Sequence, residues 1–157
     1  MNQNLMSLLV FLGVCLGVEA ASGLVTRQSV STWYVALNKP PWTPPGWIFA
    51  PVWTLLYVLM AVAAWLVWQR RASHPVTWAQ GLFALQLLLN ACWSFIFFGQ
   101  RNLGLALLDI VLLLLALVVT VVCFWSIRPL AGALLAPYLV WVSFASALNY
   151  AIWRLNV

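Results

Sequence analysis

Apolar residues run along this chain in five long, almost uninterrupted stretches. Each stretch has about 20 residues, the length that an α-helix needs to cross a hydrocarbon core of about 30 Å. Within the stretches apolar and polar positions do not alternate as they do in the strands of a membrane barrel. The pattern predicts an all-α membrane protein, a five-transmembrane-helix bundle, and one transmembrane domain over 1–157. The expected helices are residues 5–25, 47–68, 78–98, 103–125 and 130–153.

Three of the four links between these stretches are short, at 69–77, 99–102 and 126–129. Links of this length join helices that are antiparallel and pack together. Residues 1–4 carry no positive charge, and the stretch after them is long enough to span. We therefore expect a retained first helix rather than a signal peptide.

The remaining link, 26–46, is longer and differs in composition. Its second half contains four prolines, each of which fixes φ and lacks a backbone donor. The link as a whole also contains the aromatic residues Trp33, Tyr34 and Trp42. A linker that is simply solvated would not be expected to contain so many. We predict that this link covers one mouth of the bundle and that regular helix resumes near Ala50.

Composition supports a membrane protein and argues against other classes. Of the 157 residues, 66% are hydrophobic and 6% charged, whereas a soluble domain carries about 25% charged residues. The net charge of +5 comes from seven scattered cations, without the basic patch that binds nucleic acid. Across five spans these cations divide four against three, so the positive-inside rule leaves the orientation open.

Residues that hold metals or perform catalysis are scarce. The three cysteines lie inside apolar stretches, and the single histidine, His74, lies in a polar link. Neither pattern has metal-ligand spacing, and the chain has no phosphate-binding loop, dinucleotide-binding glycine motif or nucleophile elbow. We therefore expect no metal and no resident cofactor.

Three of the predicted helices each have a face that mixes aromatic and uncharged polar side chains, because residues at helical spacing share a face. The faces are Gln86, Asn90, Trp93 and Phe97; Tyr138, Trp141, Ala145 and Asn149; and Trp53, Tyr57 and Met60. Ligand pockets are largely apolar with a few oriented polar groups, so these faces predict a cavity within the bundle. The alternative is that the amides only form hydrogen bonds between helices.

Two acidic residues lie within the apolar stretches, where ionisable groups are candidates for function. Asp109 lies about two turns into the fourth predicted helix. We expect it to form a structural pair, with Arg101 close enough in sequence to reach it. Glu19 is deep in the first helix, and the sequence alone assigns it no role.

Short motifs occur in the long link and in every stretch after it. They are Trp33-Tyr34, Leu37 to Trp47, Pro51-Val52-Trp53, Leu89-Asn90, Phe97-Phe98-Gly99, Ala106 to Asp109, Pro137 to Trp141 and Leu148 to Arg154. Together they resemble the TspO/MBR family, which comprises the tryptophan-rich sensory proteins of bacteria and the mitochondrial translocator protein, or peripheral benzodiazepine receptor. The first stretch matches that family only in hydrophobicity.

The resemblance implies a five-helix bundle, usually a homodimer, with a cavity under the first loop. It also implies binding of porphyrins such as protoporphyrin IX and haem, of cholesterol, and of synthetic isoquinoline and benzodiazepine-type ligands. The cavity residues implied by position are Trp33, Tyr34, Trp53, Asn90, Trp141 and Ala145. The implied sterol motif, a pattern of low specificity, is Leu148, Tyr150 and Arg154. Glu19 departs from the small or apolar residue expected there, which puts the pocket floor on the first helix in doubt.

The function that the resemblance favours is a membrane receptor or sensor. One alternative is a light-dependent porphyrin-degrading enzyme, in which Trp33 and Trp141 would take part and the photochemistry would belong largely to the pigment. Another is a porphyrin or sterol transporter, although the five stretches show no inverted repeat. We expect the chain in a bacterial membrane, or in the mitochondrial outer membrane if its source is eukaryotic.

Overall fold

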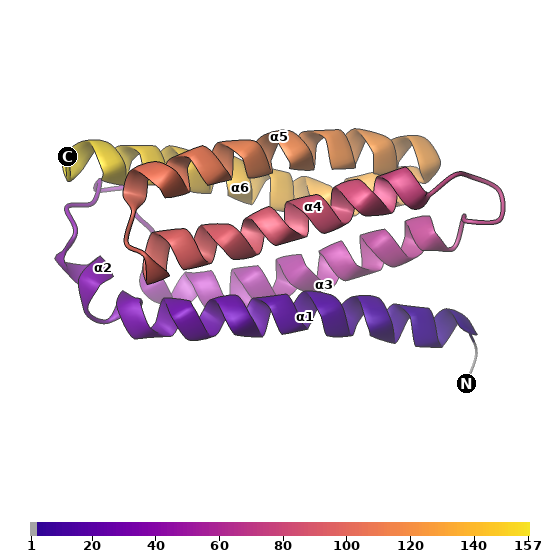
Figure 1. Cartoon of the computed structure of the whole chain (residues 1–157), viewed down its shortest axis with the longest axis horizontal. Coiled ribbons are helices and arrows are strands. Elements are labelled where there is room, and N and C mark those ends of the chain that lie inside the picture. Colours follow the sequence, from indigo (N-terminus) through magenta and orange to yellow (C-terminus); the bar gives the residue numbers. More distant parts are fainter. Residues whose placement is uncertain (1–2) are drawn as a thin grey trace.

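The computed structural model describes residues 3–157, which form a bundle of five long helices (Figure 1). These are α1 (Gln3–Val30), α3 (Phe49–Trp68), α4 (Thr77–Ser94), α5 (Leu103–Ile127) and α6 (Pro129–Leu155). Together with two short flanking turns, they form five segments that are long and apolar enough to cross a membrane. The predicted multi-pass α-helical bundle is therefore confirmed.

Three short elements complete the described chain: the single-turn helix α2 (Trp33–Ala36), the 3-10 turn η1 (Gly46–Ile48) and the π-helical turn η2 (Phe95–Gly99). Regular helix resumes at Phe49, close to the predicted Ala50. Pro51 lies in the first turn of α3, where its missing N–H would have had no partner within the helix.

The first helix is longer than predicted, because α1 continues to Val30 rather than ending at residue 25. Thr26 and Ser29 gave this segment the polarity of a loop, but both hydroxyls are satisfied within the bundle. Thr26 Oγ1 donates to Ser22 O at 2.9 Å, and Ser29 Oγ donates to Phe98 O in η2 at 2.7 Å. The link that crosses the end of the bundle is therefore residues 31–46, called the covering loop below.

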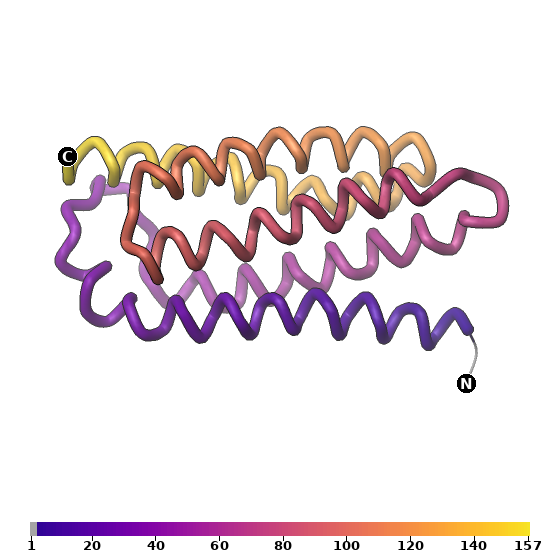
Figure 2. The backbone as a smooth tube through the Cα atoms, in the orientation of Figure 1, coloured from indigo at the N-terminus to yellow at the C-terminus, as the bar shows by residue number. Residues whose placement is uncertain are grey.

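Each long helix packs against particular neighbours. α1 lies on α3 and on α4 with η2, α3 packs on α6, α6 on α5, and α5 on α4. α1 buries only Cys15, Ser22 and Ser29, so much of its surface faces outward. The trace in Figure 2 shows the covering loop at the same end of the bundle as the end of α6, opposite the start of α1.

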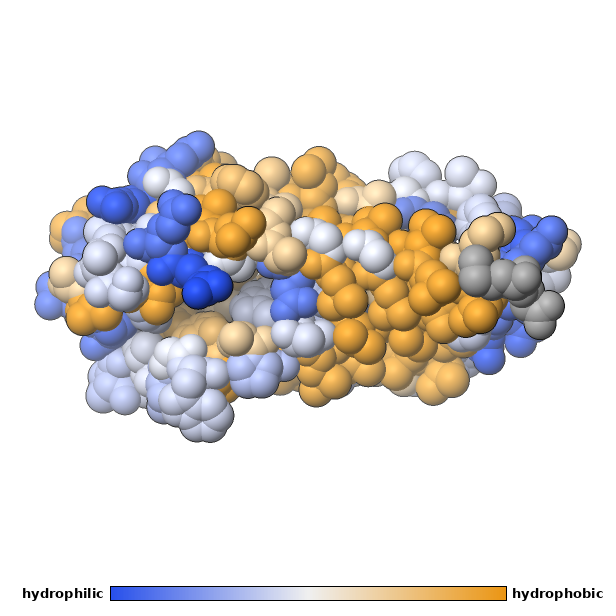
Figure 3. Space-filling model, turned by 90° about the horizontal axis from the view of Figure 1, so that it is seen from below, coloured by the Kyte–Doolittle hydropathy of each residue, from blue (hydrophilic) through white to orange (hydrophobic). Residues whose placement is uncertain are grey.

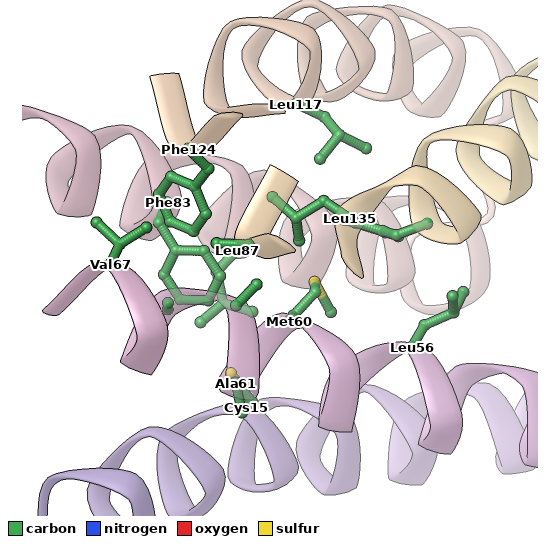
Figure 4. Packing of buried hydrophobic residues seen from close by; sticks show 14 of the residues in the cluster. Cys15, Leu56, Met60, Ala61, Val67, Phe83, Leu87, Leu117, Phe124 and Leu135 are labelled. Atoms are coloured by element: carbon green, nitrogen blue, oxygen red, sulfur yellow. The ribbon is translucent and has the colours of Figure 1, made fainter. Parts of the chain in front are cut away.

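The half of the bundle far from the covering loop is filled by apolar side chains (Figure 4). Phe83 and Phe124 stack with ring centroids 5.9 Å apart. Met60, Leu117 and Leu135 are fully buried in the same cluster. The helices of this half therefore touch through close-packed side chains.

Candidate functional site

A cavity of about 750 Å³ lies in the other half of the bundle, next to the covering loop. Its walls come from the second half of α1, the start of α3, the end of α4 with η2, and the last turns of α6, and Tyr34 of α2 contributes from the loop. Figure 3, which views the bundle from below, shows a hollow toward the left end of a surface whose middle is apolar. A cavity is thus present within the bundle, as predicted, and the covering loop contributes Ser31, Tyr34 and Gly46 to its lining.

One wall of the cavity is a group of aromatic rings on α4, η2 and α2. Trp93 stacks on Phe97 with centroids 5.0 Å apart, and Phe97 meets Phe98 edge-on at 4.8 Å. The ring centroids of Tyr34 and Phe98 are 5.8 Å apart. Because burial raises the pKa of Tyr34, its phenol remains protonated at neutral pH and able to donate a hydrogen bond.

Asn149 holds the indole of this wall in place. Trp93 Nε1 donates to Asn149 Oδ1 at 3.0 Å, and Asn149 Nδ2 donates to Leu103 O at 3.1 Å. One amide therefore connects α4, α5 and α6. Trp93 and Asn149 both border the cavity, so this hydrogen bond supports the wall directly.

The opposite wall is formed by α3. Phe49, Trp53 and Tyr57 border the cavity, and the rings of Trp53 and Tyr57 are 5.9 Å apart. Tyr57 Oη donates to Asn90 Oδ1 at 3.2 Å, and Asn90 Nδ2 contacts Tyr138 Oη at 2.6 Å. Asn90 is 2% exposed and joins α3, α4 and α6, as the alternative of interhelical hydrogen bonding expects.

The structure separates the predicted site residues into two layers. Tyr34, Trp53 and Ala145 border the cavity, whereas Trp33, Asn90 and Trp141 are not among its lining residues. Trp33 packs on Phe97, and Trp141 packs on Phe49 and Trp53. Trp33 and Trp141 therefore lie behind residues that face the cavity.

The three residues of the implied sterol motif do not face a common site. Leu148 is buried and borders the cavity. Tyr150 is 52% exposed and Arg154 is exposed at the end of α6. Tyr150 and Arg154 therefore have the positions of interfacial anchors.

The covering loop is fixed in place just before its proline-rich part. Lys39 Nζ donates to the carbonyls of Tyr34, Val35 and Leu37 at 2.7–3.1 Å, and lies 5.0 Å from the Tyr34 ring centroid. Asn156 exchanges two hydrogen bonds with the backbone of Asn38, at 3.0 and 2.9 Å. These contacts attach the loop to the last residues of the chain.

α1 contributes more to the cavity than the sequence predicted, because it supplies much of the polar surface. Glu19, Ser22, Thr26 and Arg27 all border the cavity. Their spacing of three, four and one residues along a helix was the available signal. Because the predicted helix ended at residue 25, Thr26 and Arg27 were expected in the link and not on the same helical face as Glu19 and Ser22.

The expected pairing of Asp109 with Arg101 is not seen. Asp109 is 8% exposed, and its Oδ2 has no hydrogen-bond partner among residues 3–157. Arg101 is exposed beyond η2, where its φ of 57° belongs to a sharp turn. Neither residue borders the cavity.

Comparison with known proteins places these features in a family. The model of the TspO/MBR family matches residues 11–154. The chain is 42% identical to "Tryptophan-rich protein TspO" of Chlorobaculum tepidum over 99% of both chains. It is 43% identical to the human "Translocator protein" over 79% of this chain and 75% of that one. It is 37% identical to "Tryptophan-rich sensory protein" of Cereibacter sphaeroides over 99% of this chain and 95% of that one.

Proposed function

The chain belongs to the TspO/MBR family, and we propose that it is a membrane receptor or sensor for flat, hydrophobic ligands. Porphyrins such as protoporphyrin IX and haem are the first candidates, and cholesterol and isoquinoline or benzodiazepine-type compounds are further ones. The bacterial and archaeal relatives that it matches over nearly their full length support a microbial membrane as its location. A homodimer, which the family also leads us to expect, stays a prediction.

The observation that carries this proposal is the cavity itself. Its volume of about 750 Å³ falls within the range of about 300–1,000 Å³ that is typical of small-molecule sites. Trp93, Phe97 and Trp53 face it from two walls, and aromatic rings stack well on planar conjugated molecules. A flat macrocycle inserted between these walls would bury most of its apolar surface.

Charge at the end of the cavity near the covering loop suits the acidic side chains of a porphyrin. Arg27 is exposed and borders the cavity, and a guanidinium binds a carboxylate through two parallel hydrogen bonds. Lys39, the other cation of this region, is less suited to this role, because its ammonium group already donates to three carbonyls. We therefore assign the propionates to Arg27.

The test is a titration with protoporphyrin IX, followed by quenching of tryptophan fluorescence. Wild type is compared with Ala145→Phe, which places a ring inside the cavity, and with Ala147→Phe, the same change at an exposed position of the same helix. We expect saturable quenching in wild type and Ala147→Phe, and at least about tenfold weaker binding in Ala145→Phe.

The control variant separates the cavity from the surroundings of the protein. Pigment that only partitions into detergent would quench all three proteins alike and without saturation, and that result would end the porphyrin proposal. Thermal melting of each variant checks that the bundle is intact.

A further inference from the structure

We propose that Glu19 and Ser22 of α1 form a polar subsite in the cavity that selects aromatic ligands carrying a protonated amine. The inference rests on the proposed function, because it concerns the same cavity and names a chemical group that its ligands should carry. It gives a role to the acidic residue that the sequence left unassigned.

Glu19 has unused hydrogen-bonding capacity next to the cavity. Within residues 3–157 its carboxyl group has a single hydrogen-bond partner, Thr54 Oγ1 of α3. Thr54 Oγ1 also lies 3.1 Å from Ala50 O, and a hydroxyl has only one proton to donate. A carboxylate can accept about four hydrogen bonds, so Glu19 is poorly satisfied by the protein alone.

Ser22 supplies the second, independent observation. It is 7% exposed, it borders the cavity, and its Oγ lies near the Tyr57 hydroxyl but forms no hydrogen bond of good geometry among the described residues. The next hydroxyls on α1 behave differently, since Thr26 and Ser29 each donate to a carbonyl. A buried hydroxyl without a partner is unfavourable, so a ligand that hydrogen-bonds to Ser22 would remove that cost.

The charges along α1 divide the cavity into two ends. Glu19 is the only acidic residue and Arg27 the only basic residue among the described residues that line it. Arg27 follows eight residues later, about 12 Å along the helix, and lies nearer the covering loop. An ammonium group at Glu19 would therefore be well separated from Arg27, and the attraction is stronger in a site of low dielectric than in water.

The subsite also predicts how a ligand is oriented. A molecule with an amine at one end and an acid at the other would direct the amine toward Glu19 and the acid toward Arg27. A ligand with an acid alone would use only the end of the cavity near the covering loop. Selectivity for the amine is thus a property of the end at Glu19, distinct from the contact that we assign to Arg27.

The test uses matched fluorescent probes: 1-pyrenemethylamine, its neutral N-acetyl derivative, and 1-methylpyrene. Binding is measured at neutral pH by energy transfer from tryptophan in wild type, Glu19→Gln and Asp109→Asn. Asp109 is the matched control, because it is the other acid within the apolar helices and does not border the cavity. We expect wild type and Asp109→Asn to bind the amine at least about tenfold more tightly than either neutral probe.

In Glu19→Gln the preference for the amine should disappear while the affinity for 1-methylpyrene stays unchanged. Ser22→Ala should reduce the preference by a smaller factor, about threefold. Thr54→Val should leave the preference in place, because it removes a competitor for Glu19. Equal amine preference in wild type and Glu19→Gln would overturn the proposal.

The neutral probes distinguish failure of this inference from failure of the proposed function. If 1-methylpyrene saturates wild type without any preference for the amine, only the subsite is refuted. If no probe saturates the folded wild-type protein, the cavity is not a ligand site and both proposals fall. The comparison of the amine with its N-acetyl derivative needs only wild type, so it holds even if a variant does not fold.

Discussion

The two halves of the bundle are built from the same helices and yet differ in how the space between them is filled. Away from the covering loop, Phe83 and Phe124 stack and fill the space between α4 and α5. Near the loop, Trp53 and Trp93 border an open volume of about 750 Å³. Aromatic residues occur in both halves, so aromatic content alone does not decide whether a region is packed or hollow.

The two halves of the bundle differ in the helix segment that faces the aromatic side chains. The loop half faces the part of α1 that contains Ala20 and Gly23, and a Cβ added at Gly23 would meet nothing within 4 Å. At the other end, a Cβ at Gly132 would lie 2.9 Å from Trp125 Cα. Gly132 thus allows a close contact in the packed half, whereas the position of Gly23 has room for a side chain beside the cavity.

The largest expected effect comes from removing a ring in the packed half. Phe124 is fully buried, so Phe124→Ala should lower the free energy of unfolding by about 3–5 kcal/mol. Thermal or denaturant unfolding in detergent measures this loss. Leu115→Ala, at a residue that is 60% exposed on the same helix, is the control and should change stability far less. A small loss for Phe124→Ala would contradict the packing described for this half.

The reverse experiment fills the hollow half. Gly23→Leu should weaken binding of protoporphyrin IX at least about tenfold, because the new side chain occupies cavity space. The free energy of unfolding should not fall, because the substitution removes a glycine from inside a helix, where glycine costs about 0.5–1 kcal/mol relative to alanine. Fluorescence titration and thermal melting measure the two effects. Gly13→Leu, at an exposed glycine of the same helix, should leave binding unchanged, and equal losses in the two variants would argue against a site at Gly23.

A smaller effect should follow from detaching α1 from η2. Ser29→Ala removes the buried hydrogen bond to Phe98 O, which should reduce the free energy of unfolding by about 1 kcal/mol. Amide exchange should also rise in the last turns of α1 before it rises elsewhere. Ser7→Ala, whose hydrogen bond is local and exposed, is the matched control. If the two serines gave the same result, the contact between α1 and η2 would not be what holds the end of the helix.

The smallest effect should come from the contact between the covering loop and the end of the chain. Asn156→Ala removes the two hydrogen bonds to Asn38. Because both residues lie near the surface, overall stability should fall by less than about 1 kcal/mol. Hydrogen exchange should increase at Asn38 and leave the core of α3 unaffected. Unchanged exchange at Asn38 would show that the remaining contacts, made by Lys39 and by Asn38 Nδ2 with Leu155 O, are enough to fix this part of the loop.

Much of the fold could be predicted from the sequence, because hydrophobic length determines which segments can span. The start of α3 near Ala50 and the shared faces of α4 and α6 also followed from proline chemistry and helical spacing. The end of α1 could not be predicted in the same way. The polar side chain of Ser29 can be buried in the last turn of α1 because it donates a hydrogen bond to Phe98 O. Phe98 lies far away in the sequence, so this partner could not be foreseen.

The sequence predicted several residues that border the cavity but not how deep each side chain lies behind its surface. Spacing brought Trp53, Trp93 and Ala145 to a common cavity. It could not tell that Trp141 stands behind Phe49 and Trp53, because residues on one helical face can differ in their depth. The polar residues of α1 were missed for a related reason, since their role depends on what the neighbouring helices leave unfilled.

An odd number of spans has a consequence for experiments in cells. The start of α1 and the end of α6 lie at opposite ends of the bundle, and the covering loop shares the end of α6 (Figure 1). In a membrane these two ends face different compartments, whichever orientation the chain adopts. A reporter enzyme fused after residue 157 would therefore identify the compartment that the covering loop faces, and one fused before α1 would report the opposite compartment.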